Sequence, residues 1–193
     1  MVRTEGTSAL KHDGTYTLAD WRSWPAGERW ELIDGIAYGM SPAPRVTHQE
    51  KAYDLGRKLG NFLEGKPCRP FMAPLDVFLE ESGSESGSSA GGMVVEPDVM
   101  AVCDPGKIGD DGIHGAPDFV AEVLSDSTAN KDFGVKKELY ERTGVREYWI
   151  IHPDTGTVFQ YIRDGSLFAP VREHRRGVTV QSSIFPGFSW LCQ

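Results

Sequence analysis

Apolar residues recur at two spacings along the chain, one typical of helices and one typical of strands. From residue 48 to 63 they lie at helical spacing, which predicts an amphipathic helix packed on a sheet. A short helix is expected over residues 17–24, with Thr17 as its N-cap. A further helix is predicted over residues 130–143, ended by Gly144.

Strand-like runs fill much of the remaining sequence. Residues 29–33 and 36–40 flank Asp34-Gly35, the dipeptide that a type I′ turn favours, so they predict a β-hairpin. Other strands are expected at residues 75–80, 93–103, 119–124, 147–151 and 157–162, with short pieces in 177–191.

The order of these elements indicates the fold class. Strand, helix and strand follow one another between residues 118 and 151, which predicts a crossover unit in a mixed sheet. We therefore expect an α/β (α+β) protein with a central mixed β-sheet flanked by helices. A length of 193 residues with 39% hydrophobic content suits one domain over 17–193, preceded by a loose N-terminal arm over 1–16.

A Gly/Ser/Glu-rich stretch at residues 81–92 predicts a hairpin tip or flap. The first ten residues contain no apolar signal-peptide core, and no later stretch approaches the roughly 18 apolar residues of a membrane span. A cytoplasmic protein without membrane contact is expected.

The cysteines are three in number and far apart in the sequence. Cys68, Cys103 and Cys192 form no C-x-x-C pair and no spacing typical of a zinc site. The prediction is three reduced thiols, with Cys103 in the core.

The formal net charge of −8 weakens the case for tight nucleic-acid binding, which depends on Lys and Arg near the phosphates. It does not exclude such binding, because a nuclease centre concentrates carboxylates that a cation offsets and a local basic face can coexist with an acidic total.

Two carboxylates interrupt apolar, strand-like runs. Asp98 follows Pro97, and Glu122 lies among β-branched and aromatic neighbours, where an ionised carboxylate needs compensation. A divalent cation is one compensation, because two carboxylates on adjacent strands and the Val123 carbonyl form the oxygen half-shell that Mg²⁺ favours. Pairing with Arg or Lys, or emergence at a strand end, is the alternative for each.

A second Pro-Asp pair ends in Asp118, four residues before Glu122. In an extended strand those two residues are roughly 13 Å apart, too far to share one metal. Asp98 is therefore the better partner for Glu122.

Several motifs of the chain occur in a fixed order. They are Trp30-Glu31-Leu-Ile-Asp34-Gly35, Met40-Ser-Pro-Ala-Pro with His48, Glu96-Pro97-Asp98, Pro117-Asp-Phe-Val-Ala-Glu122-Val-Leu-Ser125, Asp132 with Lys136 and Tyr140, and Gly144-Val-Arg-Glu-Tyr-Trp149-Ile-Ile-His-Pro153. As a set, over about residues 17–160, they resemble the PD-(D/E)XK restriction-endonuclease-like superfamily, and within it the Uma-type family of short restriction endonucleases.

The resemblance implies a catalytic set of Asp98, Glu122 and Lys136. The lysine that the superfamily places two residues after the glutamate is absent, since that position is Leu124. In the family this lysine lies on the following helix, four residues after an aspartate, as Lys136 follows Asp132.

Residues 132, 136 and 140 share one face of the predicted helix, so Asp132, Lys136 and Tyr140 are expected to point toward Glu122. Lys137 is the alternative lysine, on a different part of the helix. A further alternative makes Lys136 one solvated charge of a charged run.

Glu31 is similar to an acidic residue that many of these nucleases contribute to the metal, directly or through water. The rival interpretation pairs it with Arg29 or Arg146. His48 matches a family position and is a possible supporting residue, although we do not expect any histidine to be a metal ligand.

The resemblance implies Mg²⁺- or Mn²⁺-dependent hydrolysis of phosphodiester bonds, with nucleic acid, most readily DNA, as partner and a homodimer as the assembly. Asp98, Glu122 and the Val123 carbonyl would hold the metal, with Lys136 on the attacking water or the phosphate.

Two other classes remain open. One is a nuclease-like fold that binds nucleic acid or protein without cutting. The other is a structural module whose exposed Trp21, Trp24 and Trp190 form a protein interface.

Overall fold

The computed structural model describes residues 16–25, 28–40, 43–80, 92–125 and 127–193. The predicted N-terminal arm, apart from Tyr16, and the predicted flap, apart from Gly92, lie outside these residues. The strand predicted over residues 75–80 is shorter in the structure, where only Val77–Phe78 forms a strand, labelled β4.

A seven-stranded mixed sheet forms the centre of the fold. Its path runs β11-β10-β9-β8-β6-β3, and β12 pairs with β10. Strands β8 and β9 are parallel and the other pairs antiparallel, which confirms the expected crossover unit. The bounds are β3 (Arg69–Met72), β6 (Val99–Val102), β8 (Phe119–Val123), β9 (Glu147–Ile151), β10 (Val158–Asp164), β11 (Leu167–Phe168) and β12 (Arg172–His174).

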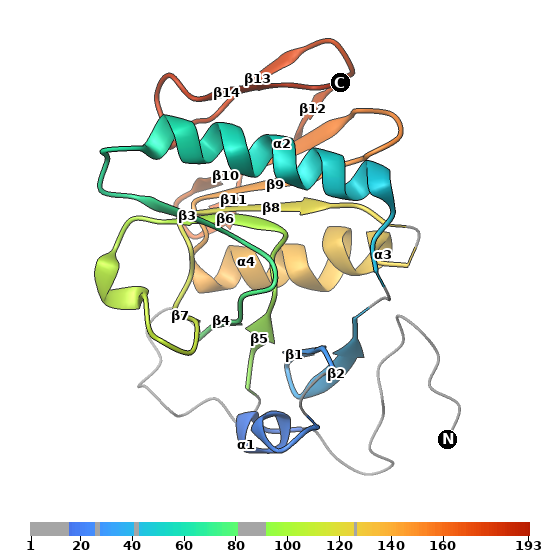
Figure 1. Cartoon of the computed structure of the whole chain (residues 1–193), viewed down its shortest axis with the longest axis vertical. Coiled ribbons are helices and arrows are strands. Elements are labelled where there is room, and N and C mark those ends of the chain that lie inside the picture. The colour runs from blue at the N-terminus through green and yellow to red at the C-terminus, as the bar shows by residue number, and fades with distance from the viewer. Residues whose placement is uncertain (1–15, 26–27, 41–42, 81–91, 126) are drawn as a thin grey trace.

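Helices cover both faces of this sheet (Figure 1). On one face lies α2 (Val46–Leu63), whose Leu55 and Leu59 are fully buried against β6, β8 and β9. On the other face, α3 (Ala129–Lys131), the π-helical turn η2 (Asp132–Lys136) and α4 (Lys137–Thr143) follow one another. The central sheet flanked by helices is therefore confirmed.

The helix predicted over 130–143 is present, but its middle is π-helical. It ends at Gly144, which caps α4 in the left-handed conformation at φ 103°. Because η2 ends at Lys136 and α4 begins at Lys137, the helical segment is continuous, and one side of it packs against the central sheet.

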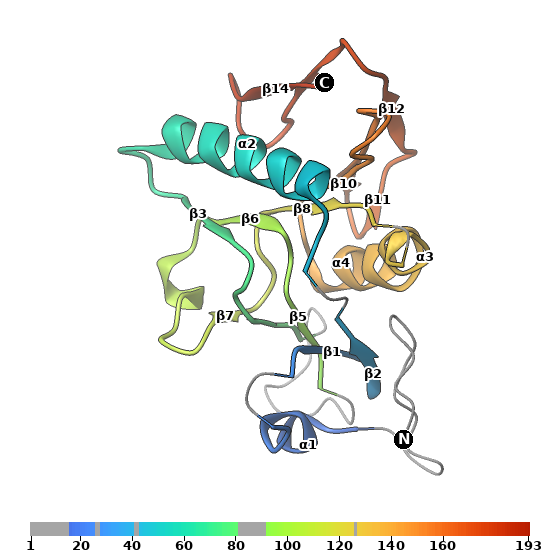
Figure 2. The ribbon, with the colours of Figure 1, turned by 45° about the vertical axis from the view of Figure 1, so that its right-hand side comes forward.

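A second, five-stranded sheet has the order β2-β1-β5-β4-β7 and was not predicted as a separate sheet. Figure 2 shows it on the side away from α2, next to α1 (Leu18–Arg22). Its strands are β1 (Trp30–Ile33), β2 (Ile36–Gly39), β4, β5 (Val94–Val95) and β7 (Ile113–His114).

The predicted hairpin is confirmed as β1 and β2, with Asp34 at φ 53° and Gly35 at φ 77° in the turn. The predicted strand over 93–103 is instead divided between the two sheets as β5 and β6. Residues 96–98, which include Asp98, are the connection that links them.

The predictions for Cys68, Cys103 and Trp190 are wrong. Cys68 and Cys103 form a disulfide, because β3 pairs with β6 with Arg69 opposite Val102 and so brings the flanking cysteines together. Cys192 is a free, buried cysteine as predicted. Trp190 is only 1% exposed, because β13 (Thr179–Gln181) and β14 (Ser189–Leu191) pack it into the core beside α2, so it cannot form an outer interface.

Candidate active site

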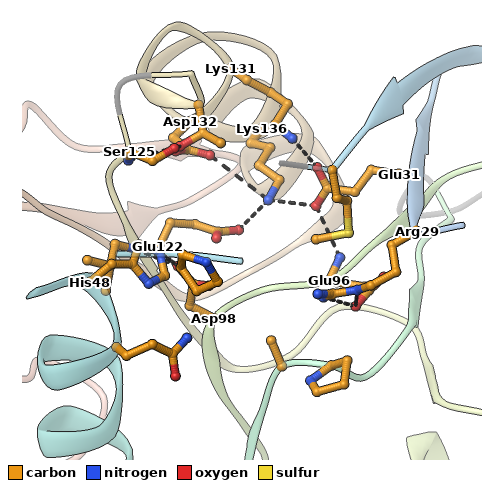
Figure 3. Close-up of a pocket in the computed structure, with 17 residues that line it drawn as sticks. Arg29, Glu31, His48, Glu96, Asp98, Glu122, Ser125, Lys131, Asp132 and Lys136 are labelled. Atoms are coloured by element: carbon orange, nitrogen blue, oxygen red, sulfur yellow. Dashed lines mark hydrogen bonds and ion pairs between the residues drawn. The ribbon is translucent and has the colours of Figure 1, made fainter. Parts of the chain in front are cut away.

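Four segments from both sheets and the helical crossover meet around one pocket of about 300 Å³ (Figure 3). The central sheet contributes Glu122 from β8 and Asp98 from the connection into β6. The second sheet contributes Glu31 from β1, and the helical segment contributes Asp132 and Lys136.

Asp98 and Glu122 lie side by side at one end of the central sheet. The Asp98 carboxylate accepts a hydrogen bond from the Val123 backbone N–H at 2.8 Å, which ties it to the residue after Glu122. The register of β6 on β8, with Val99 opposite Ala121, produces this pairing. The prediction of adjacent strands holds for Glu122, which lies in β8, whereas Asp98 lies one residue before the neighbouring strand β6.

Asp118 lies at the opposite end of β8, also as expected. Its carboxylate accepts from the Cys103 N–H at 2.8 Å and pairs with Arg146 at 3.1 Å. It does not line the pocket.

Lys136 is buried between carboxylates, with only 3% of its surface exposed. Its ammonium group lies 2.7 Å from Glu122 Oε1 and 2.7 Å from Glu31 Oε1, and 4.0 Å from Asp132 Oδ1. The interpretation of Lys136 as a solvated charge is therefore wrong. Lys137 instead pairs with Glu141 outside the pocket.

Tyr140 completes the surroundings of Glu122. Its hydroxyl donates to Glu122 Oε1 at 2.8 Å, and the whole residue is buried. The predicted helix face of Asp132, Lys136 and Tyr140 is thus confirmed, although the turn that carries the first two is π-helical.

Burial and charge shift the protonation of this cluster in different directions. Burial raises the pKa of Glu122 to about 8, against the attraction of Lys136 and with repulsion from Asp98. Burial also raises the pKa of Asp132 to about 6, again opposed by Lys136. Burial acts in the same direction on Glu31, but Lys136 and Lys131 outweigh it and lower its pKa to about 2.

Glu31 has partners that neither sequence interpretation foresaw. It is fully buried, pairs with Lys131 and Lys136, and accepts the backbone N–H of Glu96 at 3.1 Å. The predicted pairing with Arg29 or Arg146 is wrong. Arg29 binds Glu96 instead, with Nε 3.1 Å from Oε2.

His48, from the first turn of α2, reaches the site as its family position suggested. Its Nε2 atom lies 3.2 Å from Asp98 Oδ2. Burial lowers the pKa of His48, but the hydrogen bond and charge of Asp98, with a backbone contribution from Val123, raise it overall. Its Nδ1 atom is buried and has no hydrogen-bond partner among the described residues.

Glu96 and Lys131 also line the pocket, and the sequence analysis assigned them no role. Glu96 did carry a signal, because it is a second carboxylate in the same apolar run as Asp98. Lys131, beside Asp132, carried no sequence signal that distinguishes it from other surface lysines.

Within the described ranges, no three His, Cys, Asp or Glu side chains are gathered closely enough to form a metal cluster. Asp98, Glu122 and the Val123 carbonyl include only two such side chains, and Glu31, the third carboxylate predicted at the metal, forms no group of three with them but pairs with Lys131 and Lys136. A carboxylate pair beside a backbone carbonyl, with Glu122 buried and Asp98 half-buried, offers the hard oxygen donors that Mg²⁺ and Mn²⁺ accept.

A mixed sheet flanked by helices, with a carboxylate pair and a buried lysine at one end, defines a nuclease-like fold of the restriction-endonuclease type. The chain belongs to the family described as "Putative restriction endonuclease" (Uma2), whose model matches residues 18–192.

Among solved structures, the chain is similar to the crystal structure of a putative nuclease belonging to DUF820 from Anabaena variabilis ATCC 29413. The two share 18% sequence identity at a TM-score of 0.68, over 88% of this chain and 90% of that one, so the likeness shows the fold. Among curated proteins there is no significant match. In the described part of the chain, no helix is long and apolar enough to cross a membrane.

Proposed function

We propose that this protein is an endonuclease that uses Mg²⁺ or Mn²⁺ to hydrolyse phosphodiester bonds, with DNA as its substrate. The observation that carries the proposal is the contact of buried Glu122 with Lys136, beside Asp98, in a pocket open to solvent. Membership of a restriction-endonuclease family supports it.

The residues divide into metal ligands and groups that hold them. Asp98, Glu122 and the Val123 carbonyl would bind the metal. When bound, the metal lowers the pKa of a water and neutralises charge on the phosphate. Tyr140 donates to Glu122 Oε1 and so fixes the direction of that carboxylate.

Lys136 would stabilise the charge that develops on the phosphate, or orient the attacking water, with the one N–H group that Glu122 and Glu31 do not use. Glu31 keeps both Lys131 and Lys136 in place through its ion pairs. A direct contact between Glu31 and the metal stays a prediction.

Lys131 is the second ammonium group at this pocket, and 13% of its side chain is exposed. Because Glu31 does not use all three of its N–H donors, Lys131 can contact a phosphate oxygen of the substrate.

The test combines calorimetry of Mg²⁺ and Mn²⁺ binding with cleavage of plasmid and single-stranded DNA. Asp98→Asn and Glu122→Gln should lose both metal binding and cleavage. Asp118→Asn is the matched control, because Asp118 belongs to the other Pro-Asp pair and lies outside the pocket. Full cleavage by Glu122→Ala would refute the assignment.

A binding module that does not cut is the second candidate, and one observation favours it. The ammonium group of Lys136 is already held by the carboxylates of Glu31 and Glu122. Metal-independent binding of nucleic acid, without cleavage in either metal, would support this candidate against the enzyme.

The homodimer belongs to the proposal as well, because two such sites would allow both strands of a duplex to be cut in one binding event. Sedimentation of the protein with and without duplex DNA measures the assembly directly.

A further inference from the structure

A second pocket of about 300 Å³ lies beside the candidate active site. The Arg29–Glu96 ion pair lines both pockets and forms a shared wall between them. The second pocket is lined by aromatic rings, which the proposed hydrolysis does not use: Trp21, Trp24 and Trp30.

The aromatic walls are held in place by the small sheet and the capped helix beneath them. The Trp21 indole N–H donates to the Trp30 carbonyl at 2.8 Å, and the Trp21 ring packs edge-on against Phe78. The rings of Trp24 and Trp30 meet with centroids 5.7 Å apart at an interplanar angle of 64°. None of the three indoles is fully buried, so each can present ring surface to a ligand.

Charged groups surround these rings. Asp76, Glu28 and Glu96 supply carboxylates, while Arg22 and Arg29 supply guanidinium groups. Arg22 and Arg29 offset two of these three carboxylates, so little negative charge is left to attract a cationic ligand, although aromatic rings and carboxylates alone would suit an ammonium group. A flat, neutral, polar ligand fits this mixture of rings, acceptors and donors better.

We propose that this pocket binds an unpaired nucleobase of the nucleic acid whose phosphodiester lies in the active-site pocket. Indole rings stack on any base, and the Asp76 carboxyl can meet the polar edge of the base. Arg29, at the shared wall and half-exposed, lies where the backbone would pass from one pocket to the other. The proposal rests on the proposed function, and it makes a single-stranded or locally opened substrate the preferred one.

The test measures binding of short single-stranded oligonucleotides that carry 2-aminopurine, without divalent metal so that no cleavage occurs. Quenching of 2-aminopurine reports stacking on an indole. Trp24→Leu should weaken binding about 10-fold and abolish the quenching, because base stacking on one aromatic ring contributes about this much. Trp24→Phe should retain most of the affinity. Tyr53→Leu, at an exposed residue of α2, is the control and should change nothing.

An abasic site separates the pocket from general electrostatic binding. When the abasic site is placed at successive positions of the oligonucleotide, one position should weaken binding by the wild type. At that position the abasic site should not weaken binding by Trp24→Leu any further, because this variant already lacks the stacking contact. Equal wild-type affinity at every position would overturn the proposal, as would saturable binding of tetramethylammonium with none of the base. Because metal binding and plasmid cleavage are measured separately, failure of the base pocket is distinguishable from failure of the nuclease assignment.

Discussion

Replacing Lys136 by methionine tests whether the buried ion pairs hold the two sheets and the helical crossover together. Lys136 is 3% exposed and contacts both Glu122 and Glu31 at 2.7 Å. Methionine keeps the volume of the side chain but removes its charge, so the two carboxylates lose a shared cation.

The magnitude follows from what remains after the substitution. Removing one partner of a buried ion pair destabilises a protein by about 3–5 kcal/mol. Here Lys131 continues to hold Glu31, and Glu122, with a pKa raised to about 8 by burial, can take up a proton. We therefore expect the lower end, about 3 kcal/mol, or roughly 6–12 °C in melting temperature for a chain of this length.

Lys137→Met is the matched control. Lys137 is the next residue, but it is 27% exposed and pairs with Glu141 on the outside of the helix. Exposed pairs of this kind contribute about 0–1 kcal/mol.

The assay is urea unfolding of both variants and the wild type in EDTA, followed by circular dichroism and tryptophan fluorescence. If Lys136→Met unfolds at the same urea concentration as Lys137→Met, the ion pairs contribute no net stability and the reasoning is refuted. If the two variants differ as expected, repeating the melt with Mg²⁺ or Mn²⁺ tests whether a metal can replace the missing ammonium charge.

Three further predictions concern sites away from the candidate active site. Cys103→Ser removes the disulfide to Cys68, which closes a loop with a sequence separation of 35. The free energy of unfolding measured in urea should fall by about 4 kcal/mol. An unchanged urea midpoint in the variant, or a wild-type midpoint that does not respond to dithiothreitol, would contradict the disulfide. Burial and repulsion from Glu96 raise the pKa of Asp76 to about 6, so ionisation of this carboxyl lowers the stability of the folded protein as the pH rises from about 4 to 6. Asp76→Asn should therefore stabilise the protein by about 1 kcal/mol at pH 7.5, a value discounted for partial exposure, with little gain near pH 4. Equal gains at both pH values would count against this. Glu147 is fully buried and accepts five hydrogen bonds from the strands and the C-terminal segment. Glu147→Gln should therefore lower the melting temperature by roughly 10 °C, whereas a shift below about 2 °C would show that this hydrogen-bond network is not needed for stability.

Local sequence determined most of the individual elements. The Asp34-Gly35 turn, the capped helix after Thr17 and the helix end at Gly144 depend on backbone preferences of a few adjacent residues, and all three are confirmed. The order of strand and helix around residues 118–151 likewise fixed the parallel pairing of β8 and β9, because a crossover helix joins strands in that orientation.

Part of the site was also readable from the sequence. An ionisable residue inside an apolar run needs a partner wherever the chain folds, so Asp98 and Glu122 stood out. The resemblance to a nuclease family then brought in Lys136 and Tyr140, and the structure places both against Glu122.

Only the tertiary structure decided which charges meet across the chain. Glu31 lies 100 residues from Lys131, and nothing in their local sequence links them. Cys68 and Cys103 come together through the register of β3 on β6, and Trp190 is buried because the last two strands pack beside α2. Such contacts depend on how whole sheets and helices pack, and local periodicity contains no information about that packing.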